Sequence, residues 1–524
     1  MIGIRLSLVS SLGTALAIVL ALSLGAPQAQ AQFVCVGNAD GGTVPTTETA
    51  SGAGATAAGD ARNVACGTSA NASSVGTTSA ANTALGDSAN ASGGVAGAVS
   101  VNTATGFSAN ASGDNSSNTA IGNTATANGN SSNNTALGVT ANASGNNGSN
   151  VATGNGANAS GSPVAGPSGT IASQNVASGF QANASGNGAF NVATGSNANA
   201  SGNFAAGGTI SANVAIGTNS DAHGDGSFNT ATGPGANASG THSFNFAGGT
   251  DANASGNNTS SNLALGAVAN ASGDASNNSA LGNSANASGA GSNNIAFGTH
   301  AIANGNAVGI NGALNIAIGD AANGSGDGGT NVATGANATA TGAGSGNVAT
   351  GVGDNASGGT AGTPSTNVAT GAQANASGTN SFNAATGANA NASGSNSNNI
   401  ATGNSANASG TLGANIATGH LADAHGTSSS NLASGLSANA QGSNSSNNAS
   451  GAAANASGNA SFNNATGFLA NAAATAASIP RPDARRMPAA LSALTSRPGH
   501  LQMPAVPAAP MSRSATAPMP MAPG

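Results

Sequence analysis

A short unit that recurs through most of the chain is the feature that most constrains its fold. From Asn63 onward we count 24 copies of N-x-A-x-G-x-x-A-N-A-S-G, each followed by a variable stretch, at a modal spacing of 16 residues. Position 3 of the unit is Ala and position 5 is Gly in all 24 copies, while position 10 is Ala in 23 and position 12 is Gly in 22. Self-similarity at a fixed short period predicts coils that stack on one another in register.

Composition favours a thin coil over a conventional domain. The 524 residues include 82 Gly, no Trp, no Tyr and 12 Phe, and only 4% of them are charged. Large side chains supply most of the burial in an ordinary core, so this chain is not expected to build one. We therefore predict an all-β chain that forms a parallel β-roll or β-solenoid of about 24 short repeats, and no enzyme domain.

Each unit predicts two short strands, at positions 1–4 and 8–11. Side chains alternate between faces along a strand, so the Ala residues at positions 3, 8 and 10 are expected to point inward, where only methyl groups fit. Gly at positions 5 and 12 is expected to make the tight turns, because a positive φ is cheap without a Cβ. The structural turn glycines that we single out are Gly106, Gly113, Gly122, Gly217, Gly224, Gly403 and Gly410.

Asn recurs at positions 1 and 9 of the unit. In stacked parallel coils identical Asn side chains lie above one another and can hydrogen-bond as ladders. The alternative is that Asn is only a tolerant turn residue, and its fixed register favours the ladder. Surplus residues of the longer units follow position 12, as in residues 161–174 and 202–212, which predicts one corner loop that is free to grow.

Positions 2 and 4 are expected to point outward, and they often carry large apolar residues. Examples are the pairs Val214/Ile216, Leu263/Leu265 and Ile295/Phe297. An apolar outward stripe on a thin solenoid needs a cover. Association with further copies of the chain is the cover that we expect.

Charge narrows the partners. The net charge is −7, Lys is absent, and none of the seven Arg residues falls within residues 63–478. Nucleic-acid binding requires cations that neutralise phosphates, so we expect no nucleic-acid partner for the repeats. The same lack argues against electrostatic docking on anionic lipid.

The N-terminal residues 1–31 are expected to be a signal peptide. Arg5 is followed by an apolar run from Leu12 to Leu24, and Ala29-Gln30-Ala31 fits a cleavage site. A single membrane anchor is the alternative, and the run is short for one. Residues 32–62 are then an N-terminal cap segment before the repeats. The mature chain is expected to be exported, with no membrane-spanning segment.

The chain has two cysteines, Cys35 and Cys66. An even count in an exported chain permits one disulfide, which would join the N-terminal segment to the first repeat. Two unbonded, buried, Ala-like cysteines are the alternative, and a bond between chains is less favoured.

Residues 479–524 change character. They hold ten of the 16 Pro, five of the seven Arg and no Asn, which predicts a disordered tail. Three interpretations stay open: a solvated end, a segment that binds an acidic partner, or the product of a shifted reading frame or truncated gene.

The search for reactive groups gives little. The acidic residues are scattered, with no paired carboxylates, no Ca²⁺-binding nonapeptide and no phosphate-binding loop. Asp221-Ala-His223 and Asp423-Ala-His425 replace N-A-S at positions 9–11, but two ligands do not make a metal site, and solvated surface pairs are expected. We expect no catalytic residues, no metal and no cofactor.

The unit resembles the YadA-like head repeats of trimeric autotransporter adhesins. The copies that carry the resemblance best are Asn213-Val-Ala-Ile-Gly217, Asn118-Thr-Ala-Ile-Gly122 and Asn315-Ile-Ala-Ile-Gly319, and it extends over residues 63–478. It implies a left-handed parallel β-roll, a homotrimer with positions 2 and 4 at its axis, and adhesion at a Gram-negative cell surface. The 16-residue period is longer than the family's usual one, and residues 479–524 show neither its coiled-coil stalk nor its β-barrel anchor.

Three functions stay open at this point. The first is an extracellular or cell-surface adhesin head, which mediates attachment or auto-agglutination through an unidentified host or environmental receptor. The second is a secreted ice-binding or other non-adhesive structural solenoid, because position 4 is Thr in a run of units from Thr334 to Thr418. The third is a disordered, matrix-like secreted protein.

Overall fold

The computed structural model describes residues 49–51, 55–60, 62–75, 80–94, 97, 99–166 and 169–473. The chain divides into two units, Met1–Thr475 and Ala476–Gly524, and the second lies wholly outside the described residues. So do the expected signal peptide, Cys35 and the expected disordered tail, and these stay predictions.

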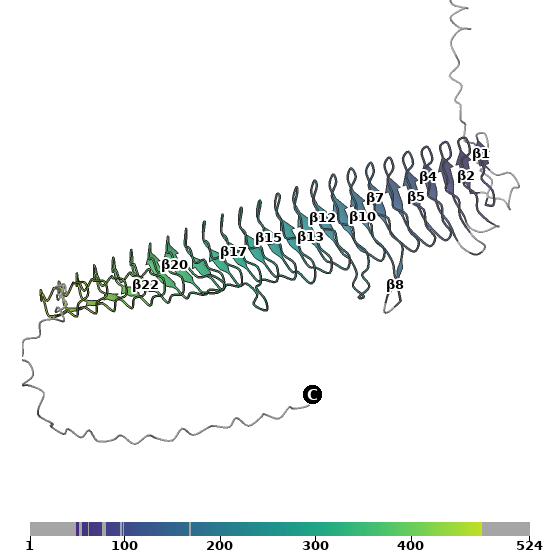
Figure 1. The fold of residues 1–524 in the computed structure, drawn as a ribbon. Helices are drawn as coiled ribbons and strands as arrows, with labels where there is room; N and C mark the ends of the chain where they lie inside the picture. Colours follow the sequence, from purple (N-terminus) through teal and green to yellow (C-terminus); the bar gives the residue numbers. More distant parts are fainter. Residues whose placement is uncertain are drawn as a thin grey trace, which may run out of the picture. The chain divides into compact units, whose positions relative to one another are not determined.

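The described residues form an all-β parallel solenoid of about 25 turns with no helix (Figure 1). Twenty-five short strands make one sheet, and each pairs in parallel with the strand of the next coil. Two further strands, β8 and β9, form an antiparallel hairpin, so that β7 pairs directly with β10. The strands are β1 (Thr49–Ser51), β2 (Val64–Cys66), β3 (Thr83–Leu85), β4 (Thr103–Thr105), β5 (Thr119–Ile121), β6 (Thr135–Leu137), β7 (Val151–Thr153), β8 (Val164–Gly166), β9 (Gly169–Ile171), β10 (Val176–Ser178), β11 (Val192–Thr194), β12 (Val214–Ile216), β13 (Thr230–Thr232), β14 (Phe246–Gly248), β15 (Leu263–Leu265), β16 (Ser279–Leu281), β17 (Ile295–Phe297), β18 (Ile316–Ile318), β19 (Val332–Thr334), β20 (Val348–Val352), β21 (Val368–Ala372), β22 (Ala384–Thr386), β23 (Ile400–Thr402), β24 (Ile416–Thr418), β25 (Leu432–Ser434), β26 (Asn448–Ser450) and β27 (Asn464–Thr466).

The solenoid begins one coil before the first unit found in the sequence. Strand β1 pairs with β2, and Thr56 forms a bridge with Asn71. Part of the segment that we expected to be a cap therefore forms one further coil of the solenoid. The sequence from Glu48 to Gly59, ETASGAGATAAG, has the Ala and Gly residues of the unit but neither Asn. A search that starts from Asn does not find it.

The second predicted strand is reduced to a single bridge at position 9. Asn90, Asn110 and Thr126 form such bridges in successive coils. In most coils the Asn at position 9 binds its own chain two residues on: the Asn183 Oδ1 accepts the Ser185 N–H and the Ser185 hydroxyl. This local bond turns the backbone away from the ladder after one residue, so positions 8–11 do not make a regular strand.

The core consists of Ala methyl groups and Asn side chains. The Ala residues at positions 3, 8 and 10 are almost all fully buried, as predicted from the alternation. The Asn at position 1 is buried with them, and these Asn residues are the largest fully buried side chains of the described residues. Asn191 shows why: its Nδ2 donates to the Gly202 carbonyl at 2.8 Å and its Oδ1 accepts the N–H of Asn213 in the next coil at 3.1 Å. Buried amides that are satisfied in this way clamp each coil to itself and to its neighbour.

Two physical reasons require the recurrent glycines, a positive φ and the close approach of the next coil. At position 5, Gly106, Gly122, Gly217 and Gly403 have φ values between +132° and +139°, which only glycine adopts easily. At position 12, Gly224 and Gly410 have φ values of +159° and +155°, and a Cβ at Gly113, Gly224 or Gly410 would lie 1.9–2.0 Å from the carbonyl oxygen of the equivalent glycine in the next coil. A Cβ at the four position 5 glycines would lie 2.3–2.5 Å from the corresponding oxygen, so close stacking requires glycine at both positions.

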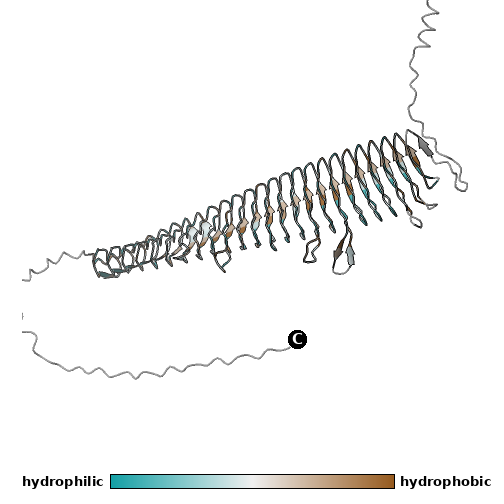
Figure 2. Cartoon of the chain, turned by 45° about the vertical axis from the view of Figure 1, so that its right-hand side comes forward, coloured by the Kyte–Doolittle hydropathy of each residue, from teal (hydrophilic) through white to brown (hydrophobic). Residues whose placement is uncertain are grey.

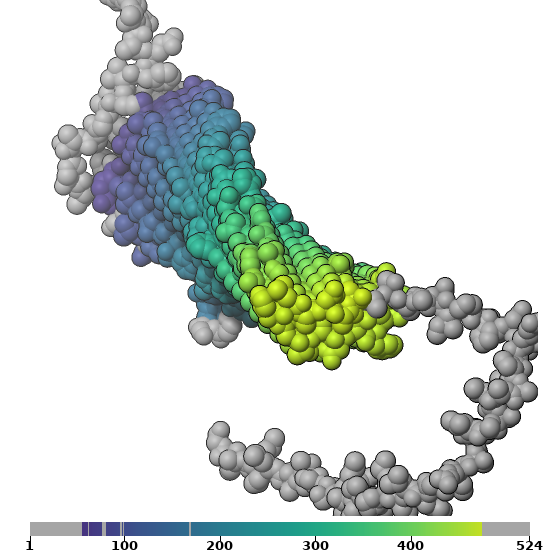
Figure 3. Space-filling view, turned by 90° about the vertical axis from the view of Figure 1, so that its left-hand side faces the viewer, coloured from purple at the N-terminus to yellow at the C-terminus, as the bar shows by residue number. Residues whose placement is uncertain are grey.

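Insertions leave the coil at one corner, after position 12, and Figure 1 shows them as projections from one edge. The hairpin β8–β9 is the largest, and Ala205–Thr209 and Val308–Asn311 close two more. In Figure 3 the side chains of successive coils form closely packed rows along the solenoid. The regular coil thus leaves two long surfaces, one over the strands and one over the position 9 bridges.

Candidate functional site

The first surface is the strand face, which we define as the outward side chains at positions 2 and 4 and at the residue before position 1. Figure 2 shows the hydrophobic colour following the strands. Its densest part runs from β15 to β18, where Leu265, Leu281, Phe297 and Ile318 are neighbours in register. Phe297 is 54% exposed, so large apolar side chains face outward here without a cover from the described residues. A contiguous apolar patch of this kind marks an interaction surface.

The strand face changes along its length. Before position 1 it carries Phe228 and Phe244, whose rings stack 5.3 Å apart in neighbouring coils. From β19 to β24 position 4 is Thr in every coil, and these hydroxyl groups form one in-register column. The apolar part and the Thr part are therefore two segments of one face.

The second surface is a groove on the opposite side of the coil. It is lined by positions 11, 12 and 13, and we call it the serine groove because position 11 is usually Ser. Three cavities join end to end from Asn128 to Asp327, and a fourth lies between His425 and Ala473. The largest has a volume of about 720 Å³ and spans six consecutive coils up to Asp225, with Thr241 beyond. The glycines at position 12 form the floor of the groove.

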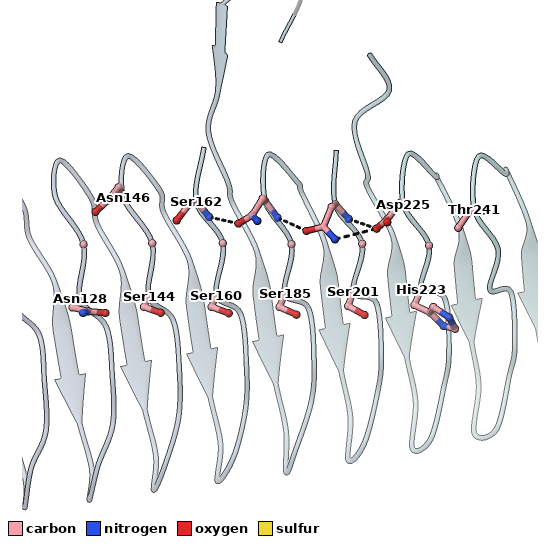
Figure 4. A pocket seen from close by; sticks show the side chains of 18 residues that line it. Asn128, Ser144, Asn146, Ser160, Ser162, Ser185, Ser201, His223, Asp225 and Thr241 are labelled. Carbon is pink, nitrogen blue, oxygen red and sulfur yellow. Dashed lines mark hydrogen bonds between the residues drawn. The ribbon is translucent and has the colours of Figure 1, made fainter. Parts of the chain in front are cut away.

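The position 13 wall is ordered by hydrogen bonds between coils (Figure 4), and the position 11 wall by hydrogen bonds within each coil. On the position 11 wall, the Ser185 hydroxyl donates to the Asn183 Oδ1 at 2.8 Å, so its free lone pairs are acceptors. On the position 13 wall, the Asn187 Oδ1 accepts the Ser162 N–H at 2.8 Å, while no hydrogen bond of the described residues engages the Asn187 Nδ2. The position 11 wall therefore offers acceptors to a ligand. The position 13 wall offers both kinds of group, because the Asn187 Nδ2 is an available donor, whereas the Asn203 Nδ2 is bound to the Asp225 Oδ1 at 3.2 Å and the Asp225 carboxylate is an acceptor.

The two Asp-Ala-His sequences lie on the position 11 wall. Each histidine Nδ1 is bonded to the Asp two residues before it, at 2.6 Å for His223 and Asp221, and at 2.5 Å for His425 and Asp423. The hydrogen bond to Asp221 raises the pKa of the His223 imidazole above its ordinary value, against the opposing effect of burial, and the bond to Asp423 does the same for His425. Each is an ion pair when its imidazole is protonated, and within the described residues no group of three or more His, Cys, Asp or Glu is placed to hold a metal ion.

Asp354 is a buried carboxylate at position 8, where 22 of the 24 units have Ala. Its oxygens accept the N–H groups of Gly371 at 2.7 Å and Ala374 at 2.8 Å in the next coil. The strands on either side of it, β20 and β21, are two residues longer than the others. Asp354 thus has a structural role in the turn that follows the strand.

The residues singled out from the sequence are distributed over the whole coil. The predicted turn glycines lie at positions 5 and 12, the two corners described above. Of these two positions, only position 12 lines a cavity in the described part of the chain, where it forms the floor of the serine groove. Cys66 is the last residue of β2 on the strand face, and its expected partner Cys35 lies outside the described residues. The predicted Asn ladder is present at position 9, where the Asn183 Nδ2 donates to the Asn199 Oδ1 at 3.3 Å. Sequence reasoning missed the serine groove, although the invariance of position 12 was a signal for it.

Comparisons with known proteins do not assign a function. No protein-family model matches the chain, and no curated protein matches it either. No helix in the described part of the chain is long and apolar enough to cross a bilayer. The fold and the two long surfaces therefore define the chain as a parallel β-solenoid, and its function has to be inferred from those surfaces.

Proposed function

We propose that the solenoid is an extracellular or cell-surface adhesin head, a rigid β-roll that mediates attachment or auto-agglutination, in which three copies pack through their strand faces. The observation that carries this proposal is the column of outward apolar side chains that follows the strands, in which the exposed Leu265, Phe297 and Ile318 are in register with the half-buried Leu281. Residues of this size are excluded from the Ala and Asn core, and water is an unfavourable neighbour for them. A symmetric homo-oligomer covers such a stripe along its whole length.

The homotrimer is tested by the mass of the secreted full chain in sedimentation or native mass spectrometry, with a matched pair of charge variants. The double variant Leu281→Asp/Phe297→Asp places two charges on the strand face. The control Ala290→Asp/Asn306→Asp places two charges at position 13 of the same coils, where Asp225 and Asp327 occur naturally.

The wild-type chain and the control are expected to be trimers, while the strand-face variant is a monomer that keeps its β circular dichroism. A monomeric wild-type chain, or a strand-face variant that remains trimeric, contradicts the packing. Adhesion itself is measured by the clumping of beads that carry the full chain, and clumping lost only in the strand-face variant supports the proposal.

A second candidate is an ice-binding solenoid. It is favoured by the in-register Thr column of position 4, which runs through Thr334, Thr350, Thr370, Thr386, Thr402 and Thr418. Position 2 beside it is Val, Ala or Ile, so the array has one hydroxyl column and not two. A face that binds ice cannot also be covered by sister chains. Thermal hysteresis from a monomer would support this candidate over the first.

A further inference from the structure

We propose that the serine groove binds an extended, neutral polysaccharide chain laid along the solenoid axis, with the preferred site over the stretch from Asn128 to Asp225. This inference goes beyond the proposed adhesin function, because it names a ligand class and a surface other than the strand face. It rests on the shape of the groove, on its hydrogen-bonding pattern and on its charge.

The shape of the groove fits a polymer and not a small molecule. The cavity between Asn128 and Thr241 is open along one side and spans six coils, which is about 30 Å at ~4.8 Å per coil. Its floor is backbone alone, because position 12 is Gly in each of these coils. A ligand that lies in it meets a glycine floor at every coil, and Ser at position 11 in four of the six coils.

The hydrogen-bonding groups of the groove are fixed before a ligand arrives. Along the position 11 wall Ser144, Ser160, Ser185 and Ser201 all donate inward to the Asn at position 9, at 2.8 Å. Along the other wall the Asn187 Oδ1 is engaged in the ladder and its Nδ2 stays available, while the Asn203 Nδ2 donates to Asp225, whose carboxylate accepts. A sugar hydroxyl both donates and accepts, so a polyhydroxylated chain satisfies both walls at once. Because the walls are already ordered, little side-chain entropy is lost on binding.

Charge and spacing exclude two other polymers. Asp225, Asp274 and Asp327 lie on the position 13 wall, and no Arg or Lys falls within residues 63–478, so an anionic polymer is repelled. In an extended peptide, groups on one side recur about every 6.8 Å, which does not match a coil pitch of ~4.8 Å. Without aromatic rings in the groove each coil contributes weakly, and affinity comes from many coils acting on one chain.

The groove can be narrowed without loss of the fold, because the chain itself carries larger residues at position 11. Gln441 occupies it in one unit and His223 in another. The test variant is therefore Ser185→Gln/Ser201→Gln, in the middle of the widest stretch. Its control is Ser88→Gln/Ser108→Gln, which makes the same change at position 7 of nearby coils, where Gln181 and Gln373 occur naturally and which lies on neither the strand face nor the groove.

The experiment measures retention of the full-length chain on microcrystalline cellulose and on linear β-1,3-glucan, with polygalacturonate as an anionic polymer and an unfolded polypeptide as a peptide. We expect binding to at least one neutral glucan, a loss of at least tenfold in the groove variant, and unchanged binding in the control. No retention on either glucan, equal binding by both variants, or retention on polygalacturonate or the peptide alone would overturn the proposal. Sedimentation of the same samples reports the trimer separately, so that failure of one proposal is distinguishable from failure of the other.

Discussion

The replacement Asn191→Ala tests whether buried Asn at position 1 holds the coils together. The Asn191 side chain makes three hydrogen bonds: the Oδ1 accepts the Asn213 N–H at 3.1 Å, and the Nδ2 donates to the carbonyls of Gly202 at 2.8 Å and Ser185 at 3.2 Å. The Ser185 carbonyl keeps a second donor, the Gly202 N–H at 3.0 Å. The variant therefore leaves two buried groups without partners, the Asn213 N–H and the Gly202 carbonyl.

Each orphaned buried group costs about 1–3 kcal/mol, so the loss is about 2–6 kcal/mol in the free energy of local opening. In a solenoid each coil contacts only its neighbours, so the effect is concentrated there. Because about 1.4 kcal/mol corresponds to a factor of ten, amide hydrogen exchange in the coil that begins at Asn213 should accelerate by at least about 30-fold. Hydrogen-exchange mass spectrometry of the full-length chain resolves this coil from distant ones.

The matched control is Asn199→Thr, at position 9 of the same coil. Thr occurs naturally at this position in other coils, as Thr126 and Thr339, and both form the usual bridge there. Exchange in the control should change by less than tenfold. If both variants accelerate exchange equally, or if Asn191→Ala leaves it unchanged, the buried Asn is not the clamp that we describe.

Three further predictions follow from single residues. Gly226→Ala should lower the temperature of thermal unfolding more than Gly344→Ala does. Both glycines have φ near +60°, so the backbone strain of Ala is similar at the two positions, but only at Gly226 does a Cβ meet the neighbouring loop, at 2.6 Å. The raised pKa of His223 implies a stabilising contribution that is present below the unfolded-state pKa and is lost as pH rises through the folded-state pKa. Asp221→Asn should lower the folded-state pKa of His223 in an NMR titration, and an unchanged value would contradict the pairing. Asp354→Ala restores the usual residue at position 8 and removes the acceptor of the Gly371 and Ala374 N–H groups. In the following coil backbone carbonyls bind the equivalent N–H groups, as the Thr370 carbonyl does for Gly387, so the urea midpoint should be unchanged or higher; a marked fall would show that Gly371 and Ala374 find no such replacement.

The strand side of the coil was predictable because its pattern obeys simple alternation. Ala at position 3 of every unit predicts an inward methyl group between two outward residues, and the structure confirms this at Ala215 between Val214 and Ile216. The parallel pairing follows from the fixed period. The same alternation also places position 1 inward with position 3. The burial of Asn213 could therefore have been inferred from the sequence.

The other side of the coil was less predictable because side chains compete there with backbone pairing. The sequence at Asn183-Ala-Ser185 predicts a strand by alternation, but the bond from the Ser185 N–H to the Asn183 side chain ends the ladder after one residue. The reason for glycine at position 12 could not be predicted either, since the sequence does not show whether glycine is needed for its φ or for a close neighbour. Only the distance from a Cβ at Gly186 to the Gly202 carbonyl oxygen, 1.9 Å, decides it.

Both long surfaces follow from the size of the core. A core that admits methyl groups and one amide per coil excludes larger apolar side chains, so residues such as Phe297 have to lie on the strand face. The close stacking that produces this core also requires glycine at position 12, which forms the floor of the serine groove on the other side. In the proposed trimer the strand faces are covered by sister chains, while the polar groove stays exposed and repeats along the length. One surface is then used for assembly and the other for the ligand, which is why substitutions on each are expected to affect trimer mass and glucan binding independently.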